Sequence, residues 1–168
     1  ALSYYHIDDY LTCPLKYKYV HVLRLPILRR HHSVVYGIAI HMAILDFYQA
    51  KINKVSFTLE DLFRSFQAAW INEGFLWPEH EEQRFSQGKE TLKRFYGREK
   101  DEPLPAYIER GFSFVLGKNE VIGRWDRIDE TPEGAVIIDF KTTDMVKKQE
   151  QANKRVKESL QLSIYALA

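Results

Sequence analysis

The sequence predicts an α/β fold of the α+β type, in which a small sheet is flanked by helices. Residues 121–129 and 135–143 are rich in β-branched side chains, and the turn residues Thr131-Pro132-Glu133-Gly134 lie between them, which is typical of an antiparallel hairpin. Residues 107–116 alternate in polarity and run into Gly117-Lys118-Asn119, which predicts one more strand. The predicted sheet therefore has three strands in this part of the chain.

Helices are predicted before these strands. Residues 3–12 are expected to form a short helix that begins near Ser3 or Tyr5 and ends before Pro14. Residues 33–52 carry apolar side chains at three- and four-residue steps, which predicts a longer helix with one buried face. The side chains expected on that face are Val35, Ile38, Met42, Leu45 and Tyr48 or Gln49.

Two more helices are predicted between residues 53 and 106. Residues 58–76 begin with Thr58-Leu59-Glu60-Asp61, which resembles a capping box, and residues 80–97 form the second helix. We interpret both as an insertion whose aromatic side packs onto the core. Residues 101–105, with two prolines, link this insertion to the sheet. From about residue 146 the chain becomes polar, and it is then expected to be helical to its end.

Composition sets few limits on function. The 168 residues are 45% hydrophobic, which is enough for a compact core. The formal net charge of +1 neither supports nor opposes nucleic-acid binding, so any binding face must come from local clustering of charge. The single cysteine, Cys13, excludes an internal disulfide. No apolar run reaches the roughly 18 residues that suggest a membrane span, so no membrane partner is expected.

The predicted hairpin brings acidic and basic side chains together. Alternate side chains of a strand share a face, so Asp139 and Lys141 are expected on one side with Phe140 opposite, and the turn brings Asp126 near them. Carboxylate oxygens are suitable ligands for magnesium or manganese. A lysine beside such a metal can position or deprotonate a water molecule, or stabilise charge on a phosphate.

A surface hairpin with solvated charges would show the same Asp-x-Lys pattern, and for any such pattern taken alone that interpretation is favoured. The neighbouring residues favour a functional role for the charged residues in this chain. Ile137-Ile138 precede the aspartate and predict a buried strand, and a buried strand does not normally end in charged residues without a purpose.

These residues carry a resemblance to a known family. Gly123-Arg124-Trp125-Asp126-Arg127-Ile128-Asp129, followed by Ile137-Ile138-Asp139-Phe140-Lys141-Thr142-Thr143, resembles the PD-(D/E)XK nuclease superfamily in its RecB-like branch. That branch includes nuclease domains fused to UvrD/Rep-type helicases, the AddB subunit and the CRISPR adaptation nucleases. Its pattern is Gly-x-x-Asp, about a dozen residues, and Asp-x-Lys. Asp139 follows Asp126 here by 13 residues.

The resemblance implies a restriction-endonuclease-like αβββα(β) core, with a mixed sheet flanked by helices and a helical insertion at residues 53–106. It implies that residues 1–168 form one nuclease domain. The strand that normally follows the last helix is missing from this fragment, so we expect the chain to be a C-terminal piece of a larger helicase–nuclease. Trp125 departs from the family, in which an aliphatic residue is commoner.

The resemblance also implies a metal site. Gly37-Ile38-Ala39-Ile40-His41 is similar to the Gly-x-x-x-His motif of the branch, in which the histidine is a metal ligand. A histidine on such a helix face is by itself more often a core residue, but the Asp-x-Lys hairpin favours the ligand. His41, Asp126 and Asp139, helped by the Phe140 carbonyl, would then hold one or two magnesium or manganese ions.

Further residues have implied roles that remain open. Gln161-Leu162-Ser163-Ile164-Tyr165 is similar to the Gln-x-x-x-Tyr motif, and its four-residue step puts both polar side chains on one helix face. They would contact the DNA backbone or support Lys141, although a surface glutamine and a core tyrosine would show the same pattern. Glu109 lies where many members carry a glutamate, and it is either a metal ligand or a structural partner of a basic residue such as Arg124.

The Cys13-Pro14 pair resembles the position of an iron–sulfur ligand in AddB-like members. A cluster needs four cysteine thiolates and this chain has one, so no iron–sulfur cluster is expected in this fragment. We interpret Cys13 as a small hydrophobic residue. The following stretch, residues 24–32, is rich in basic residues and either contacts phosphates or is a solvated loop.

The resemblance thus implies a metal-dependent DNA nuclease in which Asp126, Asp139 and Lys141 are the catalytic residues. The implied substrate is single-stranded DNA, the implied partner is a helicase motor in cis or in trans, and the process is DNA repair or recombination near the nucleoid in the cytoplasm. The alternative is a catalytically silent nucleic-acid-binding or scaffolding domain of nuclease ancestry. Such inactivated copies usually lose the aspartate or the lysine, and both are present here.

Overall fold

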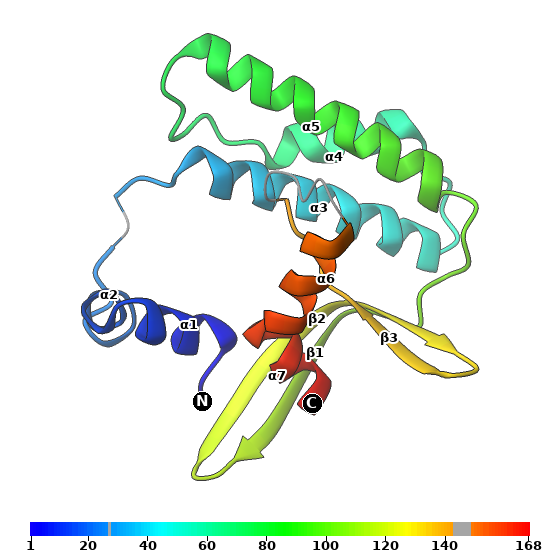
Figure 1. Cartoon of the computed structure of the whole chain (residues 1–168). Helices are drawn as coiled ribbons and strands as arrows, with labels where there is room; N and C mark the ends of the chain where they lie inside the picture. Colours follow the sequence, from blue (N-terminus) through cyan, green and yellow to red (C-terminus); the bar gives the residue numbers. More distant parts are fainter. Residues whose placement is uncertain (27, 143–148) are drawn as a thin grey trace. The chain divides into compact units, whose positions relative to one another are not determined.

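The computed structural model describes residues 1–26, 28–142 and 149–168, and the chain divides into two compact units (Figure 1). The first, which we name the sheet unit, comprises residues 1–27, 109–139 and 144–168 apart from those not described. The second, the helical unit, comprises residues 28–108 and 140–143 with the same exception. The single nuclease domain with an insertion at residues 53–106 stays a prediction.

The sheet has the strand order β1-β2-β3 and is antiparallel, so the predicted α+β class is confirmed. The strands are β1 (Tyr107–Leu116), β2 (Asn119–Thr131) and β3 (Gly134–Ile138). Gly117, with φ of +62°, makes the predicted turn between β1 and β2, because glycine adopts this left-handed conformation without strain. Within the described residues, the parallel pairing expected of a mixed sheet is limited to a bridge between Leu2 and Val121.

β3 is shorter than the strand predicted over residues 135–143. It ends at Ile138, and residues 139–142 continue outside any strand, while Thr143 lies outside the described residues. The strand along which Asp139 and Lys141 were expected to alternate therefore ends before them, and their position on one side stays a prediction. The register still supports the position of Asp126: Arg127 pairs with Ile138, and one further step of the same register sets Asp126 opposite Asp139.

Helices complete the sheet unit (Figure 1). The predicted first helix is confirmed as α1 (Tyr4–Thr12), whose N-cap Ser3 forms a capping box with His6. It is followed by α2 (Pro14–Tyr17) and by a π-helical turn, η1 (Lys18–Val22). At the other end of the chain lie α6 (Gln149–Glu158) and α7 (Leu160–Leu167). The core of this unit is formed by Val121, Ile164 and Tyr165, packed against Tyr4, Ile7, Phe112, Phe114, Trp125, Ile137 and Leu162.

The helical unit contains α3 (His32–Ile52), α4 (Leu59–Ala69) and α5 (Pro78–Glu99), which pack around one aromatic core (Figure 1). The capping box at Thr58 is confirmed: the Thr58 backbone N–H donates to Asp61 Oδ2 at 2.8 Å, and the Asp61 N–H donates to Thr58 Oγ1 at 3.2 Å. α4 ends seven residues earlier than predicted, because the chain becomes extended at Trp70. α5 begins at Pro78, a residue that fits the first turn of a helix.

The buried face of α3 differs from the predicted one. Ile38 and Met42 are each 41% exposed, whereas Ala39 and Ala43 are fully buried. Small side chains at these two positions allow the neighbouring helices to approach α3 closely, so the buried face is centred on the alanines. Length and composition alone would also allow α3 to cross a membrane. The core helix of a globular unit meets the same criteria, and eight residues of α3 are buried, so we interpret α3 as a core helix.

Candidate active site

Three carboxylates gather in the sheet unit. Asp126 lies on β2, and Asp139 follows the last residue of β3 directly, at the position that the register sets opposite Asp126. A carboxylate oxygen of Glu109, near the start of β1, lies within 4.8 Å of a carboxylate oxygen of Asp126. All three side chains are half-buried. Like charges at this separation repel one another, so the cluster favours a cation or a proton among them.

Glu109 is a structural partner of Arg124, one of the two roles that the sequence left open, and its role as a metal ligand stays a prediction. Its carboxylate lies near Asp126 and also accepts a hydrogen bond at 2.9 Å from Arg124 Nη1, a residue two positions before Asp126 on β2. Its backbone has φ of +51°, which is uncommon for a residue other than glycine. Residues held in such conformations cluster at functional sites. The hydrogen bond from Arg124 therefore helps to fix the orientation of the Glu109 carboxylate.

Gln161 holds Asp139 in place. The Gln161 side chain is buried, and its Nε2 donates to Asp139 Oδ1 at 2.9 Å and to the Tyr165 hydroxyl at 2.7 Å. An amide nitrogen has two hydrogens, and these two bonds use both. The four-residue step predicted to place Gln161 and Tyr165 on one helix face is present on α7, which begins after the N-cap Ser159. These contacts make Gln161 a positioning residue for Asp139; the proposed contacts with Lys141 and DNA stay predictions.

Tyr165 is buried beside the two aspartates. Burial raises the pKa of its hydroxyl to about 12, and the nearby charges of Asp139 and Asp126 add to the increase, although the bond from Gln161 opposes it. The Tyr165 hydroxyl is therefore protonated at neutral pH. It accepts from Gln161 and retains its own hydrogen as a donor.

We expect one tyrosine to ionise late, with a midpoint near pH 12, when the metal-free protein is titrated and followed by its ultraviolet absorbance. The folded-state pKa lies above the ordinary value of 10.0, so protonated Tyr165 favours the folded state. This contribution is complete below about pH 10 and is lost as the pH rises towards 12. Tyr165→Phe should remove the late transition and this part of the pH dependence. Tyr10→Phe, which removes an exposed tyrosine, is the control, and a late transition that survives in Tyr165→Phe would contradict the assignment.

Two aromatic residues near the site were not predicted to take part in it. Trp125 Nε1 donates to the Tyr165 backbone carbonyl at 3.2 Å and so fastens α7 to β2. This hydrogen bond gives the Trp125 indole a structural role at a position where the family more commonly has an aliphatic residue. Tyr4 packs against Tyr165 in the core, and burial and the charge of Asp8 raise the pKa of its hydroxyl. The three-residue step between Tyr4 and Ile7, both packed in the core, was the available sequence signal.

The helical unit carries His41 and Lys141. A side chain at Gly37 would come within 3.0 Å of Thr142 Oγ1, so the chain at Thr142 lies directly against α3. The Phe140 ring packs on the same unit, with its centroid 6.3 Å from that of Tyr48. Lys141 lies in the chain between these two contacts, and on α3 His41 follows Gly37 by about one turn. The metal-binding roles predicted for His41 and the Phe140 carbonyl stay predictions.

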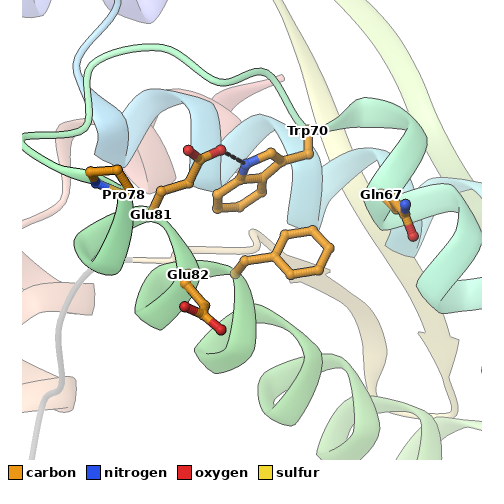
Figure 2. A pocket seen from close by; sticks show the side chains of 6 residues that line it. Gln67, Trp70, Pro78, Glu81 and Glu82 are labelled. Carbon is orange, nitrogen blue, oxygen red and sulfur yellow. Dashed lines mark hydrogen bonds between the residues drawn. The ribbon is translucent and has the colours of Figure 1, made fainter.

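Two other features, Cys13 and a pocket in the helical unit, are not assigned to this site. Cys13 is half-buried at the junction of α1 and α2, which agrees with a small packing residue. A pocket of about 330 Å³ in the helical unit is lined by Trp70 and Phe85 together with Glu81 and Glu82, and Figure 2 shows Glu81 directed at the Trp70 indole, whose Nε1 donates to it at 2.9 Å. Its carboxylates would repel a phosphate, so we do not assign this pocket to nucleic acid.

The fold and the carboxylate cluster define an α+β protein with the ligands for a divalent metal ion. The family model of the PD-(D/E)XK nuclease superfamily matches residues 1–168, and the chain belongs to that superfamily. Membership implies a nuclease, which is a hydrolase of nucleic acid that uses divalent metal. No curated protein and no solved structure matches the chain.

Proposed function

We propose that the chain hydrolyses phosphodiester bonds of DNA with magnesium or manganese, and that its substrate is a single strand. The observation that carries this proposal is the closeness of the Glu109 and Asp126 carboxylates, together with Asp139, which directly follows β3 and is held by a buried glutamine. A buried amide that orients one carboxylate is typical of a metal centre, where the partners of the ligands fix their geometry.

The donors of the sheet unit fit a hard divalent cation. Asp126, Asp139 and Glu109 offer only carboxylate oxygens, the ligands that magnesium and manganese prefer. We propose His41 and the Phe140 carbonyl as further ligands from the family motifs, for one or two ions. When bound, the ion polarises the scissile phosphate and stabilises the leaving oxygen.

The side chains around the carboxylates have separate tasks in this proposal. Lys141 orients or deprotonates the attacking water. Gln161 holds Asp139 at a fixed angle, and Arg124 does the same for Glu109. Protonated Tyr165 supplies a neutral hydroxyl, so it adds no negative charge to the site. Fixed donors and acceptors of this kind lower the cost of reorganisation during the reaction.

We also propose that the chain is part of the RecB-like branch and works with a helicase motor in DNA repair or recombination, near the nucleoid in the cytoplasm. Three motif matches support this finer assignment: Gly37-x-x-x-His41, Gln161-x-x-x-Tyr165 and Cys13-Pro14. A helicase would feed one strand to the site, and a flexible single strand reaches a recessed site more readily than a duplex does.

Cleavage of labelled oligonucleotides tests the proposal. With manganese, we expect single-stranded DNA to be cut faster than the duplex of the same sequence, and we expect a chelator to stop the reaction. RNA of the same sequence is the comparison that establishes the sugar preference. Binding of DNA without cleavage under every metal condition would instead identify a silent nucleic-acid-binding domain.

A further inference from the structure

The first turn of α1 is fixed to the strand that carries Asp126. The Leu2 N–H donates to the Glu120 carbonyl at 2.8 Å, and the Ile122 N–H donates to the Leu2 carbonyl at 2.9 Å. Tyr4 and Ile7 then pack in the core of the sheet unit with Val121 and Tyr165. The start of α1 therefore has a defined position beside the carboxylates.

Tyr5 presents an exposed ring at this position. It is 64% exposed, and its ring centroid lies 5.3 Å from that of Tyr4, which packs in the core with Tyr165. The core of this unit does not require a tyrosine here, because the exposed Tyr5 is not among the residues that pack in that core.

The segment that follows adds positive charge and more tyrosines. Residues 10–26 contain three Lys or Arg residues and no Asp or Glu, and they include Tyr10, Tyr17 and Tyr19. This segment packs back on α1, since the rings of His6 and His21 lie 4.2 Å apart and those of Tyr10 and Tyr17 lie 5.5 Å apart. Part of it is the π-helical turn η1, a conformation that is often found at functional sites.

Two of the three cations are suited to bind phosphate. Lys16 donates to Asp9 Oδ1, and this bond, together with one from His21, holds the pKa of the Asp9 carboxyl below its usual range. The charge of Lys16 is thus compensated within the protein. Lys18 and Arg24 are exposed, and the stretch that carries them contains no acidic residue that would repel DNA.

We propose that Tyr5 stacks on a base of the strand that is cleaved, and that Lys18 and Arg24 contact its backbone phosphates. This inference rests on the proposed nuclease function, since that function places the cleaved phosphate at the carboxylates. Stacking on an aromatic ring is available to every base of a single strand, whereas the bases of a duplex are already stacked on one another. The site would therefore select unpaired nucleic acid without selecting its sequence.

A protein partner is the other occupant that an exposed apolar surface suggests. Leu11 and Leu15 are exposed on the same segment and would suit a protein. Interleaved tyrosines and cations without acidic residues favour nucleic acid, because each nucleotide needs both a ring for its base and a positive charge for its phosphate. The nearness of Tyr5 to the carboxylates points the same way, since the substrate must pass there.

Equilibrium binding of a fluorescent oligothymidylate of about 20 nucleotides tests this inference, in a chelator so that no cleavage occurs. We expect Tyr5→Leu to weaken binding about tenfold and Tyr5→Phe to retain it, because the ring and not the hydroxyl stacks. Lys18→Gln should reduce the slope of log K against log salt by about 0.7. The matched controls are Tyr107→Leu, another exposed tyrosine, and Lys118→Gln in the turn between β1 and β2; both should bind like the parent.

The outcomes separate this inference from the nuclease proposal. Weaker binding by Tyr5→Leu in a protein that never cleaves DNA supports the inference and rejects the nuclease function. Cleavage with an unchanged KM, and an unchanged Kd for oligothymidylate, in Tyr5→Leu rejects the inference and leaves the nuclease function intact. Unchanged binding by all variants would reject the inference and favour a protein partner at the exposed Leu11 and Leu15.

Discussion

Replacing Asp139 by asparagine is expected to lower manganese-dependent cleavage on the order of a thousandfold or more. The substitution keeps the shape of the side chain and an oxygen that can accept from Gln161 Nε2, so the fold should be retained. It removes the negative charge that favours a divalent ion. Asp126→Asn should have a similar effect, because Asp126 and Asp139 directly adjoin the paired residues Arg127 and Ile138 of the same hairpin. Single-turnover cleavage of a labelled single strand measures both.

Manganese binding, followed by calorimetry or by electron paramagnetic resonance, separates the roles of the individual side chains. Asp126→Asn, Asp139→Asn and His41→Ala should weaken binding, and Gln161→Leu should weaken it about 10- to 100-fold through the orientation of Asp139. Lys141→Ala should bind the metal normally and still fail to cleave.

Glu133→Gln, in the exposed turn between β2 and β3, removes a carboxylate of the same hairpin and serves as the control. Normal metal binding by Asp139→Asn would contradict the carboxylate site. Cleavage at the parental rate by Lys141→Ala would contradict the catalytic role of that lysine. Both results are independent of whether the substrate is DNA or RNA.

The second large effect is expected from Gly123→Ala, which should destabilise the protein by about 1–3 kcal/mol. A Cβ atom at Gly123 would lie 2.3 Å from Phe112 Cζ, which is far inside van der Waals contact. The Phe112 ring has little room to move, because its centroid lies 4.6 Å from that of Trp125 and 5.6 Å from that of Tyr165. Close-packed interiors transmit such strain to their neighbours. Urea unfolding, with the m-value checked, measures the change in the free energy of unfolding.

Gly111→Ala is a matched control in the neighbouring strand. A Cβ atom there would meet its nearest neighbour, the Gly123 carbonyl oxygen, at 3.8 Å, an ordinary contact. Equal stability of Gly123→Ala and Gly111→Ala would show that the Phe112 ring does not cover Gly123. Combining Gly123→Ala with Phe112→Leu should cost less than the sum of the two single changes, since a smaller side chain relieves the clash.

This close contact gives the Gly-x-x-Asp motif a physical explanation. Gly123 lies three residues before Asp126, and its missing side chain allows Phe112 to cover β2. Phe112 in turn packs on Tyr165, which Gln161 connects to Asp139. Gly123 therefore supports the position of Asp139 indirectly, through this chain of contacts.

Sequence alone was sufficient for features that arise from neighbouring residues. The start of α1 near Ser3, the cap at Thr58, the turn at Gly117 and the antiparallel pairing of β2 with β3 each involve residues that are close in the chain. Hydrogen bonds of a cap and the register of a hairpin are fixed locally, so a pattern of a few residues predicts them. The family motifs then indicated which of these residues carry the chemistry.

Other features depended on residues far apart in the chain. Sequence did not show that β3 ends at Ile138, that Gln161 turns to Asp139, or that Arg124 and Asp126 both lie beside Glu109. It also placed Ile38 and Met42 in the core of the helical unit, where the structure has Ala39 and Ala43. Helical periodicity identifies a helix but leaves open which neighbour will cover each face. Local hydrogen-bonding rules thus determined the elements and aligned the two aspartates, and only the packing of distant segments decided which side chains orient those carboxylates.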